Sequence, residues 1–223
     1  ELGVSIQFEA NSSMIDEIFS DPLNTLIVFT PAIPQANSLL NYFKSNSFQV
    51  FKRSEVLGMV TKNTQCLAVA GTHGKTTTTS ILAHLLYQNN KKVTAFVGGI
   101  SENYQSNLIH RGTEISVVEA DEFDRSFLKL SPFSSVVTGV DPDHLDIYGS
   151  IEQFNEGFRQ YAMKIEPSGF LIEKEGLNLP TLAKKVSYAL HSETADYSMK
   201  NLVFRDGFIF SDVRLKTNFW QNV

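Results

Sequence analysis

The sequence predicts an α/β fold built on a mostly parallel sheet, with a small, partly antiparallel addition at its C-terminal end. Buried apolar runs alternate with helical patterns along most of the chain, as at residues 25–29 and 66–70. A glycine-rich turn joins the second of these runs to a helix that begins at Lys75. Acidic residues gather where later runs end, which is where parallel sheets place their functional groups.

The elements follow from these patterns in chain order. The pattern of residues 1–8 predicts a strand already inside a fold. Because the chain starts at Glu1 with neither an initiator Met nor a signal peptide, we expect a fragment of a longer protein. Further strands are expected at 25–29, 49–51, 66–70, 92–97, 115–118 and 135–140, and helices at 37–43, 54–60, 75–87 and 151–164. The C-terminal addition consists of short strands at 170–173, 186–190, 202–204 and 208–210. The polar stretch 61–65 predicts a linker, so we place a domain boundary between residues 62 and 63.

The composition excludes several classes of function. The chain has 223 residues, with 19 Lys and Arg against 24 Asp and Glu and a net charge of -5. It therefore lacks the diffuse basic field that binds nucleic acid, and any phosphate must be held by a local site. The single cysteine, Cys66, permits neither an internal disulfide nor a thiolate zinc cluster, which suits a reducing, cytoplasmic location. No apolar stretch approaches the roughly 18 residues that span a bilayer, and no feature indicates an oligomeric state.

The turn after residues 66–70 predicts a phosphate-binding loop. Gly71 and Gly74 allow backbone N–H groups to close on phosphate oxygens, and the N-terminus of the following helix favours an anion. The Lys75 ammonium can reach the β- and γ-phosphates, and the Thr76 hydroxyl can ligate Mg²⁺. The residues expected to bind the nucleotide are Gly71, Thr72, His73, Gly74, Lys75, Thr76 and Thr77.

This loop is a shortened version of the usual pattern, because Val69 stands where the strict motif has a glycine. Thr76 to Thr79 are poor helix formers at a place where a helix should begin, which propensity alone would not select. The alternative is a strand, turn and helix that required small residues for packing alone. The context on both sides of the loop favours a phosphate-binding loop of the P-loop ATPase type.

Two further residues are candidate metal ligands. Glu119 follows the strand at 115–118, the usual place for a carboxylate that supports Mg²⁺; alternatively it is an exposed charge at a loop entry. His144 follows the strand at 135–140 within DPDHLD and is either a ligand or a structural hydrogen-bonding residue. Gly98 and Gly99 end the strand at 92–97, where they form only a turn or let a ligand approach the backbone.

Three segments in this order resemble the Mur ligase family, the ATP-dependent amide-forming enzymes of peptidoglycan precursor synthesis: AGTHGKTTTTS, VVEADEFDRSFLKLSP and DPDHLDIY. The likeness extends to the TPAIP turn and the KRSEVL segment earlier in the chain. Within the family, the chain is most similar to the member that adds L-alanine to UDP-N-acetylmuramate. His73 supports this, since the ligases that add later residues usually carry Asn or Ser at this position.

The resemblance implies a domain organisation. Residues 1–62 would be the remainder of a Rossmann-like N-terminal domain that binds the UDP-sugar, and residues 63–223 the central ATP-binding domain. The family's glycine-rich turn for the uridine diphosphate is missing before Glu1, and its C-terminal domain is missing after Val223. We therefore expect this piece alone to form no amide bond.

The resemblance also implies a mechanism with ATP and Mg²⁺, in which the muramyl carboxylate attacks the γ-phosphate and the amine of L-alanine attacks the resulting acyl phosphate. Lys75, Glu119 and His144 would be catalytic: Lys75 would stabilise the transferring phosphoryl group, and His144 would ligate a second Mg²⁺. Thr76 and Glu119 would hold the Mg²⁺ that bridges the terminal phosphates. Substrate contacts along the UDP-sugar would come from Thr30, Ile33, Gly98 and Gly99.

The sequence leaves two alternatives open. A murein tripeptide ligase of peptidoglycan recycling shares the GTHGKT loop, although its second acidic segment usually differs from DPDHLDIY. A P-loop phosphotransferase or nucleotide-driven switch would use the same loop without any UDP-sugar, but it leaves the combination of EADE and DPDHLD unexplained.

Overall fold

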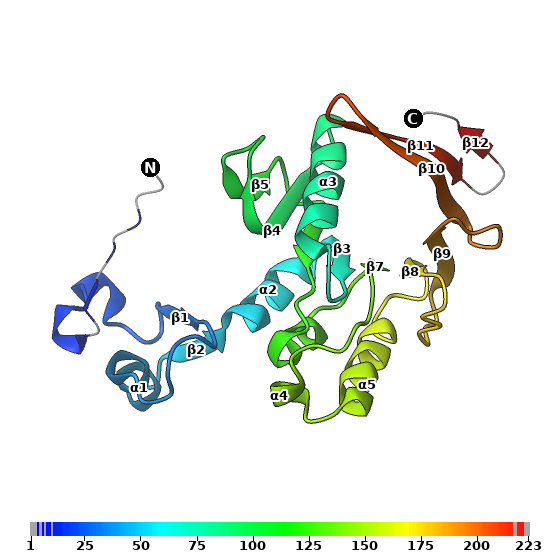
Figure 1. The fold of residues 1–223 in the computed structure, drawn as a ribbon. Helices are drawn as coiled ribbons and strands as arrows, with labels where there is room; N and C mark the ends of the chain where they lie inside the picture. The colour runs from blue at the N-terminus through cyan, green and yellow to red at the C-terminus, as the bar shows by residue number, and fades with distance from the viewer. Residues whose placement is uncertain (1–3, 5, 7, 10, 216–217, 221–223) are drawn as a thin grey trace. The chain divides into compact units, whose positions relative to one another are not determined.

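The computed structural model describes residues 4, 6, 8–9, 11–215 and 218–220 (Figure 1). The chain divides into two compact units, Glu1–Leu57 and Gly58–Val223. The division lies inside helix α2 (Arg53–Thr61), close to the linker expected at 61–65. Within the described part of the chain, no helix combines the length and the apolar character that a membrane span requires.

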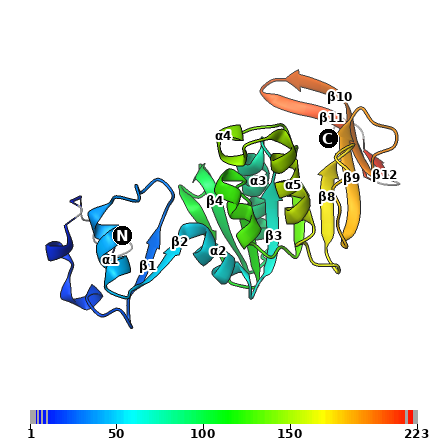
Figure 2. The same ribbon diagram turned by 90° about the horizontal axis from the view of Figure 1, so that it is seen from below.

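The first unit is a small parallel α/β arrangement (blue in Figures 1 and 2). Its elements are two 3-10 helices, η1 (Ser12–Met14) and η2 (Glu17–Phe19), followed by β1 (Leu26–Phe29), α1 (Ser38–Ser45) and β2 (Gln49–Lys52). β1 and β2 pair in parallel. Of the strand expected at 1–8, residues 4, 6 and 8 form no strand, and the remaining residues lie outside the described part.

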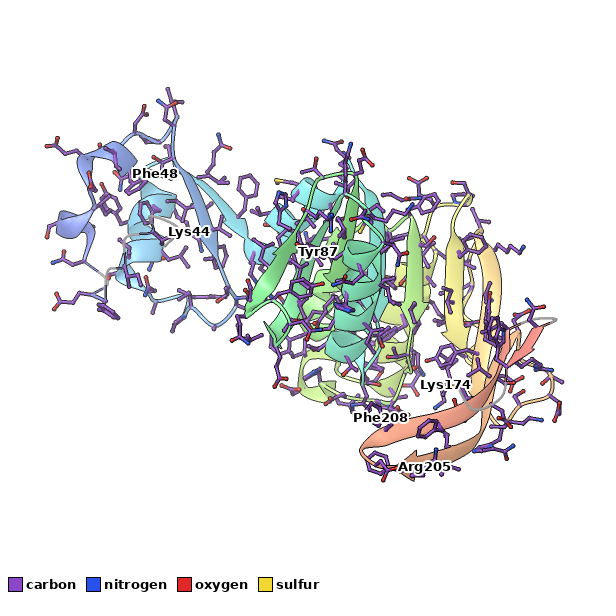
Figure 3. The ribbon with its side chains drawn as sticks, turned by 90° about the horizontal axis from the view of Figure 1, so that it is seen from above. Lys44, Phe48, Tyr87, Lys174, Arg205 and Phe208 are labelled. Atoms are coloured by element: carbon purple, nitrogen blue, oxygen red, sulfur yellow. The ribbon has the colours of Figure 1, made fainter. Side chains whose placement is uncertain are left out.

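Helix α1 begins where the sequence predicts. The side chain of Asn37 accepts a hydrogen bond from the N–H of Leu40 at 2.9 Å and so caps the helix. Leu40 is buried, and Phe43 packs edge-on against the buried Phe48 with ring centroids 4.9 Å apart. Figure 3 labels Phe48 within this unit. These contacts give the first unit its own small apolar core.

The second unit contains a large sheet with helices on both faces. In the described residues its strand order is β12-β11-β10-β9-β8-β7-β3-β6-β4-β5, and Figure 2 shows β4, β3 and β8 in this order across the sheet. The strands are β3 (Gln65–Ala70), β4 (Val93–Ser101), β5 (Ser106–His110), β6 (Ile115–Glu119), β7 (Ser134–Val137), β8 (Phe170–Lys174), β9 (Lys184–Leu190), β10 (Tyr197–Arg205), β11 (Phe208–Leu215) and β12 (Asn218–Trp220). The helices are α3 (Lys75–Gln88), η3 (Phe123–Lys129), α4 (Leu145–Tyr148) and α5 (Ile151–Ala162).

Neighbouring strands from β4 to β10 run parallel, which confirms the predicted fold class. The antiparallel addition is confirmed at β10, β11 and β12. An antiparallel strand also lies at the opposite edge, where β5 pairs with β4. The sequence did not predict β5, because its residues are mostly exposed and lack a buried apolar run.

The pleat of β3 separates two apolar cores. Leu67 and its partner Val117 on β6 belong to the core under α3. Ala68 and its partner Ser135 on β7 point to the other face, where the Ser135 hydroxyl lies 2.8 Å from the Tyr161 hydroxyl of α5. Helix α3 joins β3 to β4 on one side of β3, and α5 joins β7 to β8 on its other side. Because such crossovers are right-handed as a rule, connections in opposite directions place their helices on opposite faces of the sheet.

The strand order reverses at β3, which lies between β6 and β7. In open α/β sheets, ligands bind at such a reversal, outside the carboxyl ends of the strands. The carboxyl ends of β3, β6 and β7 carry the predicted phosphate loop, Glu119 and Thr138 respectively. The fold therefore places the predicted catalytic segments at one edge of the sheet.

The strands expected at 202–204 and 208–210 are only parts of the longer β10 and β11. Two predicted strand ends beside the phosphate loop are also wrong. β4 continues through Gly98 and Gly99 to Ser101, because β5 supplies a partner for its final residue. β7 ends at Val137 instead of residue 140, because Thr138 and Gly139 turn to hydrogen bond with the loop after β3.

Candidate functional site

The loop between β3 and α3 has the backbone that its glycines predict. Gly71 has φ 119°, and Gly74 caps α3 in the left-handed region with φ 79°. A Cβ at Gly71 would come within 2.2 Å of the Thr138 hydroxyl, whereas a Cβ at Gly74 would meet no atom within 4 Å. Gly71 is therefore required for close packing and for its φ, and Gly74 for its φ alone.

The segment after β7 fixes this loop from the side. The Thr138 hydroxyl donates to the His73 carbonyl at 2.6 Å, and the Thr72 N–H donates to the Gly139 carbonyl at 3.1 Å. The Thr72 hydroxyl accepts from the N–H of Asp141 at 3.1 Å. Because the first N–H groups of an α-helix have no partner within the helix, those at the start of α3 remain suited to an anion.

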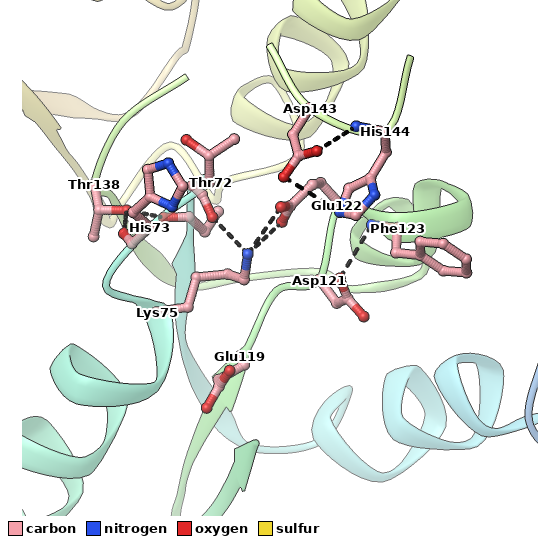
Figure 4. Close-up of polar contacts among 12 residues, drawn as sticks. Thr72, His73, Lys75, Glu119, Asp121, Glu122, Phe123, Thr138, Asp143 and His144 are labelled. Atoms are coloured by element: carbon pink, nitrogen blue, oxygen red, sulfur yellow. Dashed lines mark hydrogen bonds and ion pairs between the residues drawn. The ribbon is translucent and has the colours of Figure 1, made fainter. Parts of the chain in front are cut away.

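Lys75 lies at the centre of the site (Figure 4). Its ammonium donates to the Gly71 carbonyl at 2.7 Å and to both carboxylate oxygens of Glu122, at 2.9 and 2.7 Å. The Glu122 side chain is only 2% exposed and that of Lys75 is 17% exposed. A buried carboxylate requires a cation or hydrogen-bond donors, and Lys75 supplies both.

Glu122 is a residue of the candidate site that the sequence pattern did not distinguish from its acidic neighbours. Its backbone carbonyl accepts a hydrogen bond from the Tyr148 hydroxyl at 2.7 Å, which fixes the segment after β6 against α4. The pKa of Tyr148 is raised to about 12, mainly because the hydroxyl is buried and secondly because of the negative charge of Glu122. The segment EADE could have indicated Glu122, because a second acid three residues after Glu119 could face Lys75, the only lysine of the loop.

Glu119 and Thr76 form the second polar pair of the site. The Thr76 hydroxyl donates to Oε2 of Glu119 at 3.1 Å, and the N–H of Gly98 donates to Oε1 at 2.5 Å. The structure thus brings together Thr76 and Glu119, which were expected to share a Mg²⁺, and adds Gly98 from the interior of β4, which was expected to contact the substrate.

The oxygen atoms of Thr76 and Glu119 fit the demands of Mg²⁺. An octahedral Mg²⁺ binds oxygen at about 2.0–2.1 Å, which places adjacent ligands roughly 3 Å apart. The hydroxyl and carboxylate oxygens are 3.1 Å apart, and both are the hard type of donor that Mg²⁺ prefers. In the described residues, no group of three or more His, Cys, Asp or Glu side chains could hold a metal by itself, so water and phosphate oxygens would supply the other ligands.

His144 lies at the N-terminus of α4, with a left-handed backbone of φ 52°. Its Nε2 is 3.8 Å from Oδ2 of Asp143, and its ring packs edge-on against Phe123 with centroids 5.4 Å apart. Its side chain is 35% exposed, so it retains access to solvent. These contacts place His144 in the segment between β7 and α5, and its role as a metal ligand stays a prediction.

The predicted substrate residues lie in different parts of the chain. Gly98 and Gly99 are in β4, beside Glu119 and Thr76 respectively. Thr30 and Ile33 are in the first unit, where the N–H of Ile33 donates to the Thr30 carbonyl at 3.1 Å and closes a turn after β1. The structure therefore supports the predicted turn, and the substrate contacts stay predictions.

Comparison with known proteins identifies the family. Residues 69–218 match the Mur ligase middle domain. A UDP-N-acetylmuramate–L-alanine ligase from Phocaeicola vulgatus is 47% identical over 215 residues, which are 95% of this chain and 47% of that protein. The chain spans about half the length of the curated relatives it matches.

Solved structures show the same fold. The UDP-N-acetylmuramate–alanine ligase from Thermotoga maritima has a TM-score of 0.74 at 23% identity, over 87% of this chain and 45% of that one. The UDP-N-acetylmuramate:L-alanyl-gamma-D-glutamyl-meso-diaminopimelate ligase from Neisseria meningitides has a TM-score of 0.72 at 20% identity, over 86% of this chain and 65% of that one. Given the matched domain, its phosphate loop and the acidic residues beside it, the chain belongs to the Mur ligase family.

Proposed function

We propose that the chain supplies the ATP site of a cytoplasmic ligase that joins L-alanine to UDP-N-acetylmuramate through an acyl phosphate. The observation that carries the proposal is the pairing of Thr76 with Glu119 and of Lys75 with Glu122 at the start of α3, where the strand order of the sheet reverses. Relatives that are 46–48% identical and named UDP-N-acetylmuramate–L-alanine ligase support this acceptor over a tripeptide. Residues 63–223 would form the ATP-binding domain, and residues 1–62 part of the UDP-sugar domain.

The loop would bind the triphosphate of ATP through backbone N–H groups at the start of α3. Thr138 and Gly139 hold the loop in place before the nucleotide arrives, so little ordering is left to binding. The Lys75 ammonium would contact the terminal phosphates while Glu122 holds its position. An interaction that strengthens as charge moves in the transition state accelerates the reaction.

Thr76 and Glu119 would hold Mg²⁺, and His144 would contribute to a second Mg²⁺ near the acyl acceptor. Bound Mg²⁺ neutralises phosphate charge and orients the oxygens of the transferring group. Phosphoryl transfer needs little covalent help from the protein, so alignment and charge neutralisation are the main tasks of these side chains.

The reaction has two steps in this proposal. The muramyl carboxylate attacks the γ-phosphorus, the bond to the β,γ-bridging oxygen breaks, and ADP leaves with an acyl phosphate formed. The L-alanine amine then attacks the acyl carbon, loses a proton, and inorganic phosphate departs. Gly98, Gly99, Thr30 and Ile33 would contact the UDP-sugar.

A substrate comparison on the complete protein tests this function. The protein is incubated with ATP, Mg²⁺ and UDP-N-acetylmuramate, together with either L-alanine or the murein tripeptide, and the products are measured by mass spectrometry. We expect the L-alanine amide with equal amounts of ADP and phosphate. A clear preference for the tripeptide would assign the chain to the recycling ligase. Nucleotide hydrolysis or phosphotransfer without any need for UDP-sugar would favour a P-loop phosphotransferase or switch.

A further inference from the structure

We propose that Gly98 is a positioning residue for the metal-binding carboxylate of Glu119. The absence of a side chain at Gly98 makes room for this carboxylate, and the N–H of Gly98 turns it toward Thr76. The inference rests on the proposed function, because the Mg²⁺ that Glu119 would bind belongs to the ATP site.

The carboxylate of Glu119 is held at both oxygens. Oε1 accepts from the N–H of Gly98 at 2.5 Å, and Oε2 accepts from the Thr76 hydroxyl at 3.1 Å. A carboxylate that is fixed at one oxygen by a backbone donor presents its other oxygen in one direction. The oxygen presented here is Oε2, which lies beside the hydroxyl of Thr76, the other proposed Mg²⁺ ligand.

The strand pairing around Gly98 explains why its N–H is available. The regular parallel pairing of β4 with β6 ends at Phe96 and Val118. On the other side, the pairing of β4 with β5 is irregular between Phe96 and Ser101. Gly98 lies inside this irregular stretch, and its N–H bonds to the Glu119 side chain instead of a strand carbonyl.

Position 98 needs a glycine because the Glu119 carboxylate occupies the space of a side chain, and not because of the backbone conformation. Gly98 is not among the glycines with positive φ, so another residue could adopt its backbone. A Cβ at Gly98, however, would lie 2.7 and 2.9 Å from the two carboxylate oxygens of Glu119 and 3.0 Å from the carboxyl carbon. These atoms are the end of a flexible side chain, so a methyl group would displace the carboxylate and leave the sheet in place.

The neighbouring glycine provides a matched control. A Cβ at Gly99 would meet only the Thr76 methyl carbon within 4 Å, at an ordinary contact distance of 3.6 Å. Gly98→Ala and Gly99→Ala therefore add the same group to adjacent positions of one strand, and only the first displaces the proposed metal ligand.

The test uses the complete protein and the non-hydrolysable ATP analogue AMP-PNP. The melting temperature is measured at fixed AMP-PNP over a series of Mg²⁺ concentrations, and the Mg²⁺ concentration giving half of the stabilisation is recorded. We expect Gly98→Ala to raise this midpoint about tenfold or more, because loss of the contacts that orient a metal ligand typically weakens metal binding by at least that factor. Gly99→Ala should leave the midpoint within about twofold of wild type, and both variants should keep the wild-type melting temperature without ligand.

The role of Gly98 and the proposed ATP site can fail separately in this test. A wild-type midpoint in Gly98→Ala, with a normal response of the wild-type protein, would overturn the role of Gly98 alone. A large fall in melting temperature without ligand would also overturn it, because the strand would have moved instead of the carboxylate. If AMP-PNP and Mg²⁺ fail to stabilise the wild-type protein, the proposed ATP site is wrong and the role of Gly98 falls with it.

Discussion

Replacing Lys75 by methionine should destabilise the ligand-free protein as well as remove activity. The ammonium is the partner of the buried Glu122 carboxylate, with N–O distances of 2.7 and 2.9 Å. Removing one member of a buried ion pair typically costs about 3–5 kcal/mol, because the other charge is left buried without compensation. Lys75 is 17% exposed, so water can enter the vacated space and we expect a loss near the lower limit, about 3 kcal/mol.

The measurement is urea unfolding of the complete protein without nucleotide, followed by circular dichroism. Glu122→Gln and the double variant Lys75→Met with Glu122→Gln complete a thermodynamic cycle. Because the double variant leaves no buried charge, it should recover at least half of the stability lost in Lys75→Met. Unfolding free energies of Lys75→Met and wild type that agree within about 0.5 kcal/mol would show that this pair does not stabilise the protein, and the reasoning would fail.

Two other variants test neighbouring residues. His144→Ala should lower turnover, raise the Mg²⁺ requirement and leave the melting temperature nearly unchanged, because the side chain is 35% exposed and contributes little packing; a stability loss of roughly 1–3 kcal/mol with unchanged Mg²⁺ dependence would instead make it a structural residue. Tyr148→Phe should cost about 1 kcal/mol at neutral pH through loss of the hydrogen bond to the Glu122 carbonyl. Folding raises the pKa of Tyr148 to about 12, so the stability that the neutral Tyr148 hydroxyl contributes is fully present below pH ~10 and is lost as the pH rises toward 12. The unfolding free energy of Tyr148→Phe should therefore fall less than that of the wild type over this alkaline range. Identical pH profiles of the two proteins would contradict the role of this hydroxyl.

The sequence predicted where the candidate site residues lie when their position depends on local chemistry. The loop from Gly71 to Thr76 could be identified because its glycines, lysine and threonine are consecutive and lie between an apolar run and a helix. Glu119 could be identified because parallel strands end at a common edge of the sheet. Both predictions needed only the chain's immediate neighbourhood and the fold class.

The remaining features depend on contacts between distant residues. Glu122 and Lys75 are separated by 47 positions, and the turn into η3, with positive φ at Asp124 and Arg125, accompanies the burial of Glu122. The role inferred for Gly98 depends on the irregular pairing of β4 with β5, and no local pattern indicated that edge strand. Tertiary contacts therefore decide which acid pairs with which partner.

The proposed function depends above all on binding of the phosphates of ATP, together with Mg²⁺, by the loop around Lys75. Isothermal titration of the complete protein with AMP-PNP tests this binding directly. It is carried out with Mg²⁺ and with EDTA, and each titration is repeated with UDP-N-acetylmuramate added. We expect one nucleotide to bind per chain, with affinity reduced about tenfold or more by EDTA and also by Lys75→Ala in a protein that remains folded. Absence of binding, or an affinity that neither EDTA nor Lys75→Ala changes, would contradict the account.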